Sequence, residues 1–204
     1  MNLIQQKIKM LSPAYFALVM ATGIISIASF LNGFVAIAYV LFFLNIVYLL
    51  GLVFLFIYRV IFFRTQVLED FKSYQRGPGF FTLVAALCIV GNQLVIFYDL
   101  LLLAKVILLI AIIAWLIIGY GFFFNITVTE EKKALKDGIN GTWLVIIVAI
   151  QALSTLITFV SKDFGKDAYI YLFIALCMFL LGCIFYLYIM SLIIYRISFF
   201  SLNA

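Results

Sequence analysis

The chain has 204 residues, of which 68% are hydrophobic and only 10% are charged. That polar fraction is far too small to coat a water-soluble globule, so the composition indicates an integral membrane protein. The formal net charge of +5 would also suit a nucleic-acid or acidic-lipid partner. The basic residues lie where membrane insertion alone would put them, so we expect a lipid bilayer as the partner and no nucleic acid.

The first apolar run extends from Ser12 to Leu31, close to the start of the chain. Its length of about 20 residues is enough to cross a hydrocarbon layer of about 30 Å, whereas a secretory signal has a shorter apolar stretch followed by a small-residue cleavage site. We therefore interpret this run as a helix of the mature protein.

Apolar runs continue along the whole chain and predict six transmembrane helices. The predicted spans are Ser12–Leu31, Phe34–Tyr58, Gly79–Phe97, Leu100–Phe124, Asn140–Val160 and Ala168–Tyr195. Short connections at 32–33, 98–99 and 161–167 join the two helices of a pair, and longer charged segments join one pair to the next. The sequence therefore predicts an all-α, single transmembrane domain over residues 1–204, built of three antiparallel hairpins at approximately 12–58, 79–124 and 140–195.

Each predicted hairpin opens with a related segment. Ser12–Phe16, Gly77–Phe81 and Asn140–Trp143 stand at the starts of the first, third and fifth spans, at intervals of roughly 65 residues. The two prolines of the chain belong to the first two of these segments. A helix tolerates proline in its first turn, where the amide hydrogens have no partner. The recurrence indicates a repeated membrane hairpin.

The basic residues predict the orientation. Those at one end of the predicted bundle are Lys7, Lys9, Arg59, Arg64, Lys72, Arg76, Lys132, Lys133, Lys136 and Arg196, against Lys162 and Lys166 at the other. Because cytoplasmic loops of membrane proteins are enriched in lysine and arginine, we expect both termini in the cytoplasm and a multi-pass location in the plasma (cytoplasmic) membrane.

Polar side chains recur along the odd-numbered spans at spacings of three and four, which places them on one helix face. The even-numbered spans carry Phe, Leu, Ile and Tyr around most of their circumference, which is typical of a lipid-facing layer. The pattern therefore predicts odd helices inside and even helices outside, around a pore. The candidate pore-lining residues are Thr22, Ser26, Asn92, Gln93, Gln151, Ser154 and Thr155. Helix packing is the alternative, since small and hydroxyl side chains also let membrane helices approach each other.

The starts of the odd-numbered spans give a second argument. A helix N-terminus carries about half a positive charge, and with both termini inside, all three starts lie at the cytoplasmic face. Lys9, Arg76 and Lys136 stand just before these starts and are our candidates for attracting anions to the mouth. The orientation rule explains the same basic residues without any transport.

Little in the chain favours an enzyme or a cofactor protein. It has no histidine, and Cys88, Cys177 and Cys183 all fall inside predicted spans. We therefore expect no catalytic residues, metal or cofactor. Lys105 is the one charge well inside a predicted span. It is a functional candidate by default, although its stem is long enough to reach the headgroups near the outer end of its helix.

Segments spread over nearly the whole chain follow a known pattern: Ser12–Phe16 with Val19–Ile24, Gly79–Ala86, Asn140–Leu144 with Val148–Gln151, and Gly182–Leu187 up to Arg196. Together they resemble the tellurite-resistance/dicarboxylate transporter family. That family includes slow-type anion channels and malate and sulfite transporters. The resemblance implies odd helices around a pore, even helices outside, and often three subunits with a pore each, so a homotrimer is expected. It implies transport of a small anion, with selectivity set largely by dehydration. Malate or another C4-dicarboxylate, sulfite, tellurite, halide and nitrate all stay open.

The sequence departs from the family pattern in two ways. Family members have five hairpins, so the resemblance implies that the chain is incomplete beyond Ala204 and that the family's aromatic gate lies in the later part. The middles of the odd-numbered spans also lack the proline that would kink a pore helix. A non-transporting remnant or accessory membrane subunit is the alternative function.

Overall fold

The computed structural model describes residues 3–201, and within that range the chain is helical without a strand. Its long helices are α2 (Ala17–Leu31), α3 (Val35–Phe62), α5 (Phe81–Tyr98), α6 (Leu101–Val128), α8 (Leu144–Val160) and α9 (Ala168–Phe199). The short ones are α1 (Leu3–Lys9), α4 (Arg64–Lys72) and α7 (Leu135–Gly138). The 3-10 helices are η1 (Pro13–Phe16), η2 (Gly77–Phe80), η3 (Gly141–Trp143) and η4 (Ser161–Asp167).

Five segments are long and apolar enough to cross a membrane: Pro13–Leu31, Val35–Phe62, Gly77–Tyr98, Leu101–Val128 and Gly141–Phe199. The last one contains 59 residues and includes both α8 and α9. Gly165 interrupts it with a non-helical backbone at φ 49° and ψ −114°, in the segment where the sequence predicts a loop. The predicted all-helical membrane class is thereby confirmed, and these segments are its candidate membrane spans.

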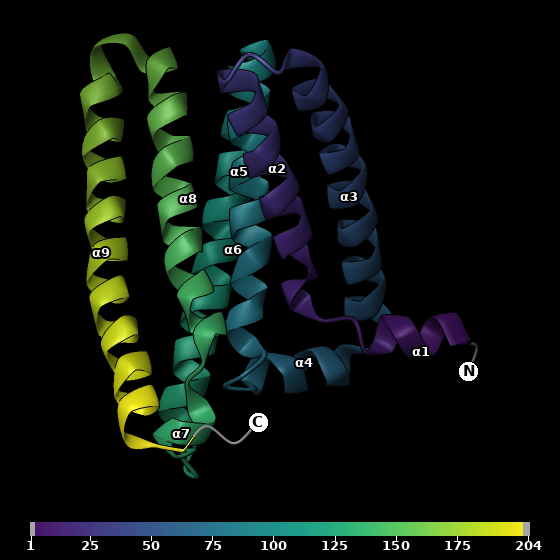
Figure 1. Ribbon diagram of the computed structural model, residues 1–204, viewed down its shortest axis with the longest axis vertical. Coiled ribbons are helices and arrows are strands. Elements are labelled where there is room, and N and C mark those ends of the chain that lie inside the picture. Colours follow the sequence, from purple (N-terminus) through teal and green to yellow (C-terminus); the bar gives the residue numbers. More distant parts are fainter. Residues whose placement is uncertain (1–2, 202–204) are drawn as a thin grey trace.

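The helices pack in neighbouring pairs, α2 with α3, α5 with α6, and α8 with α9 (Figure 1). Helix α5 stands at the centre, in contact with α2, α6 and α8, and 83% of its span is buried. Helix α2 is at the edge of the bundle, where only 22% of its span is buried. Burial thus follows the predicted inner layer for α5 and, less fully, for α8. Helix α2 is as exposed as the predicted outer helix α6, since α3 and α5 are the long helices that cover most of its contacting surface among the described residues.

The outer helices continue past the predicted spans. Helices α3, α6 and α9 end at Phe62, Val128 and Phe199, each four residues beyond the prediction. Hydropathy locates the part of a helix that suits lipid, whereas the backbone hydrogen bonds continue into the polar turn beyond it. The short α1 and α4 lie across this end of the bundle (Figure 1).

The predicted tight turns are confirmed at the opposite end. Gly33 follows α2 with φ 84°, and Asp99 follows α5 with φ 52°. Both values lie in the left-handed region, which glycine enters freely and which Asp tolerates because its short side chain bonds locally.

Close helix contacts depend on glycine. A Cβ on Gly23 of α2 would overlap the Ile89 side chain of α5 and lie 2.7 Å from Nδ2 of Asn45 in α3. Gly51 of α3 is also inside a helix, but a Cβ there would meet nothing within 4 Å. Gly23 therefore sets the distance at which α2, α3 and α5 meet.

We predict that Gly23→Ala destabilises the protein by about 1–3 kcal/mol, because the added methyl overpacks a rigid contact. Gly51→Ala is the matched control and should stabilise by up to about 1 kcal/mol, since alanine favours the helix and has room there. Thermal unfolding in detergent measures both. Equal shifts in the two variants would show that Gly23 is not a packing constraint.

Candidate functional site

Three helix starts lie together at one end of the bundle. η1, η2 and η3 lead directly into α2, α5 and α8, and η2 contacts both η1 and η3. Thr82 Oγ1 bonds to the carbonyl of Pro13 at 2.9 Å, which fixes the start of α5 against the start of α2. Trp143 Nε1 donates to the carbonyls of Tyr74 and Gly138, which anchors the start of α8. The repeated segments of the sequence are therefore neighbours in space.

Local caps explain why these segments begin helices. The Ser12 side chain accepts the N–H of Ala14 at 3.3 Å, and the Asn140 side chain accepts the N–H of Thr142 at 2.9 Å. Each cap satisfies one of the amide hydrogens that a helix start leaves without a partner. The remaining amides give this end of the bundle a positive partial charge.

A buried ion cluster supports the same end. Arg59 at the end of α3 is only 1% exposed and bonds to Asp70 of α4 at 2.5 Å and to the carbonyl of Lys9 at 3.1 Å. Arg76 bonds to the other oxygen of Asp70 at 2.9 Å and to the carbonyl of Met10 at 3.4 Å. The cluster therefore ties α1 and α4 to α3 and to the segment that starts α5.

The three basic candidates all lie at this end. Lys9 and Arg76 belong to the cluster, Lys9 through its backbone carbonyl, and the charge of Arg76 is shared with Asp70. Lys136 lies in α7 with its side chain exposed, and Gln75 reaches the neighbouring Asp137 carbonyl at 3.4 Å. Among the described residues, the ammonium groups of Lys9 and Lys136 have no carboxylate partner, whereas the guanidinium of Arg76 has one.

The two candidates of α2 share the face toward α3. Ser26 is fully buried, and its Oγ donates to the carbonyl of Ala38 in α3 at 2.8 Å. Thr22, four residues earlier, lies on the same face because residues i and i+4 stack along a helix. It is half-buried and makes no side-chain hydrogen bond within residues 3–201.

The candidates of α8 face its hairpin partner in the same way. Gln151 Nε2 donates to the carbonyl of Phe179 at 3.1 Å, and Ser154 Oγ donates to the carbonyl of Ala175 at 2.7 Å, both in α9. The exposed Thr155 bonds back to the Gln151 carbonyl of its own helix at 2.9 Å. Gln151 and Ser154 thus make the contacts that helix packing, the alternative to pore lining, would require.

The candidates of α5 differ from each other. Gln93 is fully buried, and its Oε1 accepts from Nδ2 of Asn45 in α3 at 2.8 Å. Asn92 is 3% exposed, yet its amide makes no hydrogen bond within the described residues, and its Oδ1 is a buried atom without a partner. Nε2 of the neighbouring Gln93 is likewise buried without a partner, but its Oε1 is bonded, so Asn92 is the buried candidate whose whole amide group is unpaired within the described residues.

The direction of Asn92 follows from its neighbours. A Cβ on Gly91 would touch Leu156 of α8, while Gln93 lies beside Gly23 of α2. Successive helix residues differ by about 100° around the axis, so Asn92 faces the side of α5 between α8 and α2. The site thus consists of the unpaired side-chain amide of Asn92 at the centre of the bundle. The starts of α2, α5 and α8, with the basic residues Arg76 and Lys136, lie at one end of the same bundle.

Several functional residues escape sequence reasoning. Asn45 lies on an outer helix, and Arg59 and Asp70 appear in the sequence only as part of a charged connection. A single Asn in an otherwise apolar span was a usable signal, since a polar group in lipid needs a partner. Lys105 pairs with Asp163 of η4 and lies 4.4 Å from the Phe164 ring, so its side chain points toward the end of the bundle.

We predict that Asp70→Asn lowers the free energy of unfolding by about 3–5 kcal/mol, because it leaves the charge of Arg59 buried without a counter-ion. The matched control is Asp163→Asn, whose partner Lys105 is partly exposed, so a loss below about 1 kcal/mol is expected.

Unfolding of the two variants by heat or denaturant in detergent measures the difference. If Asp70→Asn costs no more than Asp163→Asn, the buried cluster does not hold this end of the bundle together.

The chain matches one family of known proteins. A family model described as voltage-dependent anion channel (SLAC1) matches residues 10–204, nearly the whole chain. None of the curated proteins matches the chain significantly. The match begins next to η1 and covers all six long helices, including the three clustered starts and Asn92. The chain therefore belongs to the voltage-dependent anion channel family, whose members carry anions across membranes.

Proposed function

We propose that this chain conducts small anions along the face of α5 that carries Asn92. The observation that carries the proposal is the unpaired amide of Asn92, buried between helices that are otherwise hydrogen-bonded to each other. A buried polar group without a partner is costly, and it persists where function requires it. Its NH2 group is a neutral donor that can replace part of the hydration shell of a passing anion.

The mechanism follows from the charges around this site. The starts of α2, α5 and α8, together with Lys136 and the shared charge of Arg76, raise the local concentration of anions at the mouth. Asn92 offers no net charge, so an anion binds weakly enough to leave again. We infer passive conduction, with selectivity set by the dehydration energy of the anion. The substrate class includes halide, nitrate, sulfite, tellurite and C4-dicarboxylates.

We also propose that the end with α4 and α7 is cytoplasmic and that the six long helices each cross the plasma membrane, which puts both termini inside. The basic excess at this end supports the orientation. The break at Gly165 supports separate crossings by α8 and α9.

We predict that Asn92→Leu lowers the anion flux into liposomes by at least about tenfold, because removing one amide donor raises the barrier by about 1.4 kcal/mol or more. Thr155→Val is the control and should retain the wild-type flux, since its hydroxyl bonds only to its own helix. Chloride, nitrate, sulfite and malate should be compared in the same preparation.

Three outcomes of this assay contradict parts of the proposal. A wild-type chain that folds but gives no flux of any of these anions is not a conductor. An Asn92→Leu variant with unchanged flux removes Asn92 from the pathway. A large loss in Thr155→Val moves the pathway to the polar stripe of α8.

Orientation is tested by labelling single cysteines in intact cells with an impermeant maleimide, in a cysteine-free background. Lys162→Cys lies in the exposed η4 segment and should react from outside. Lys136→Cys in α7 should react only after the membrane is permeabilised. The opposite pattern would show that the bundle is inserted the other way around.

A further inference from the structure

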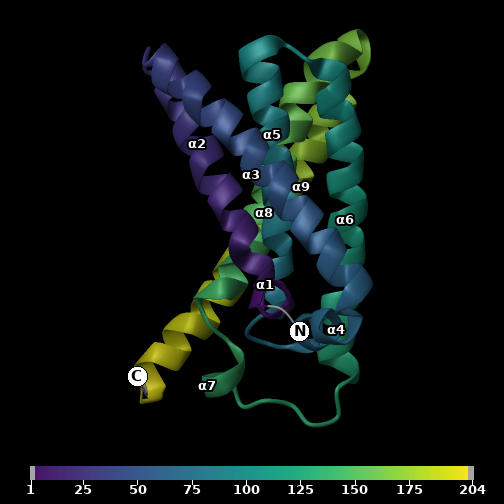
Figure 2. The same cartoon turned by 90° about the vertical axis from the view of Figure 1, so that its right-hand side faces the viewer.

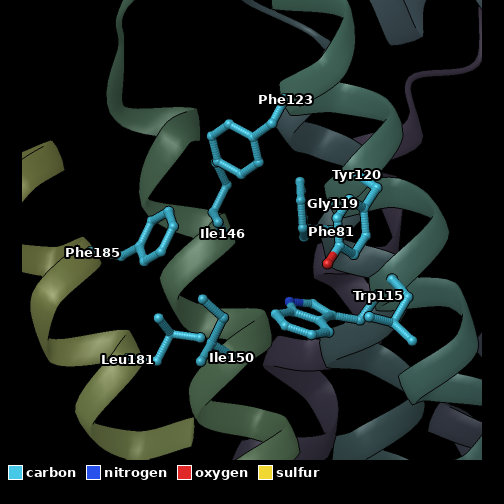
Figure 3. A pocket seen from close by; sticks show the side chains of 10 residues that line it. Phe81, Trp115, Gly119, Tyr120, Phe123, Ile146, Ile150, Leu181 and Phe185 are labelled. Atoms are coloured by element: carbon cyan, nitrogen blue, oxygen red, sulfur yellow. The ribbon is translucent and has the colours of Figure 1, made fainter.

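An apolar groove lies on the outside of the bundle, between α6 and α9 and above α8 (Figure 3). Its volume is about 270 Å³, and its walls include Gly119 and Tyr120 of α6, Ile150 of α8, and Leu181 and Phe185 of α9. None of the candidate anion-site residues lines it. Because its wall helices belong to candidate membrane spans, the groove opens toward the acyl chains of the bilayer.

Gly119 widens this groove. Glycine is unfavourable inside a helix, and elsewhere in this bundle it makes room for a neighbouring helix, as Gly182 does for Gln151. A Cβ on Gly119 would meet nothing within 4 Å, so the space beside it belongs to the groove and not to a packed side chain. Gly51 is equally open but does not line the groove, which makes it a control.

Two hydrogen-bond donors point into the same groove. Figure 3 shows the Trp115 indole nitrogen and the Tyr120 hydroxyl turned toward the pocket. Neither side chain forms a hydrogen bond within the described residues. Tyr120 is 77% exposed, on a surface that faces lipid. A donor in hydrocarbon without an acceptor is unfavourable. A molecule that carries a hydrogen-bond acceptor next to an apolar chain therefore fits this groove better than a pure hydrocarbon does.

The depth of Tyr120 identifies this acceptor. Lys105 pairs with Asp163 at one end of the bundle, and Tyr120 lies about 22 Å further along α6 at about 1.5 Å per residue. In a hydrocarbon layer of about 30 Å, Tyr120 then lies in the half next to the opposite boundary, about 8 Å from it. Tyr and Trp prefer this boundary, and the ester carbonyls of a glycerophospholipid lie there.

Cationic side chains stand beyond the groove at that same end. Lys132 caps the carbonyls of Ile126 and Thr127 at the end of α6, and Arg196 near the end of α9 bonds to the Ile139 carbonyl at 2.8 Å. Figure 2 shows the ends of α6 and α9 diverging, with α7 between them. Glu130 and Glu131 precede Lys132, so the basic excess is small. These charges suit the phosphate of a phospholipid headgroup.

We propose that this groove is a binding site for one acyl chain of a membrane glycerophospholipid, in the leaflet at the α4 and α7 end. The ester carbonyl accepts the hydrogen bond of Tyr120, and the acyl chain passes over Gly119 toward Trp115. The site is separate from the proposed anion path and does not depend on it.

The test uses the full chain in phosphatidylcholine vesicles that contain a phospholipid with a photoreactive diazirine in its acyl chain. After illumination, peptide mass spectrometry locates the label. We expect labelling of Ile150, Leu181 and Phe185 in the wild type. Gly119→Leu should reduce it about tenfold, as expected for the loss of about two methylene contacts. Gly51→Leu should leave it unchanged.

Tyr120→Phe keeps the shape of the groove and removes one donor, so it tests the proposal even if Gly119→Leu folds poorly. Labelling by an ester-linked probe should fall about fivefold, the value of one hydrogen bond. Wild-type labelling in both Gly119→Leu and Tyr120→Phe would overturn the proposal. Cross-links between two copies of the chain through the groove would also overturn it and assign the groove to a subunit interface.

Discussion

The bundle depends on hydrogen bonds from the first helix of a pair to the backbone of the second. In lipid, apolar side chains gain little from contacting each other instead of acyl chains, so close packing and polar contacts must hold helices together. Ser26 bonds to the Ala38 carbonyl in the first pair, and Ser154 bonds to the Ala175 carbonyl in the last. Both alanines are buried, and their small side chains let the serine approach the backbone. The same device thus closes two pairs that are far apart in sequence.

This use of polar side chains bears on function. Ser26 bonds to a carbonyl of α3, Gln151 and Ser154 bond to carbonyls of α9, and Gln93 bonds to Asn45 of α3. Each of these side chains makes a hydrogen bond that holds two helices together, although Nε2 of Gln93 is left without a partner. Asn92 has the same chemistry, but its direction between α2 and α8 gives it no such partner among the described residues. The distinction between adhesive and functional polar groups is therefore one of direction and not of residue type.

The sequence predicts much of the fold because membrane insertion imposes strong local rules. Hydropathy locates the apolar spans, and the Ser12–Phe16, Gly77–Phe81 and Asn140–Trp143 segments mark the three helix starts that the structure brings together. Helix periodicity groups Ser26 of α2, and Gln151 and Ser154 of α8, on faces that contact the next helix of the pair, but Asn92 and Gln93 of α5 point to different neighbours. A stripe does not say which neighbour it faces, because that depends on the rotation and order of helices in the bundle.

Other parts of the site depend on contacts distant in sequence. The pairing of Asn45 with Gln93 joins residues 48 positions apart, and no local pattern selects this partner. The Arg59–Asp70–Arg76 cluster joins residues that the charge pattern assigns simply to the cytoplasmic side. The exposure of α2 is likewise a property of the assembled bundle, since the number of neighbours that cover a helix depends on how the helices are arranged and not on its own sequence.

The most direct test of the account is to locate a bound anion. Crystals of the chain grown with bromide would show the ion by its anomalous scattering. The account predicts a bromide peak within hydrogen-bond distance of Asn92 Nδ2, between α2, α5 and α8. A peak along Gln151, Ser154 and Thr155, with none at Asn92, would contradict it and show that the polar stripe lines the anion path.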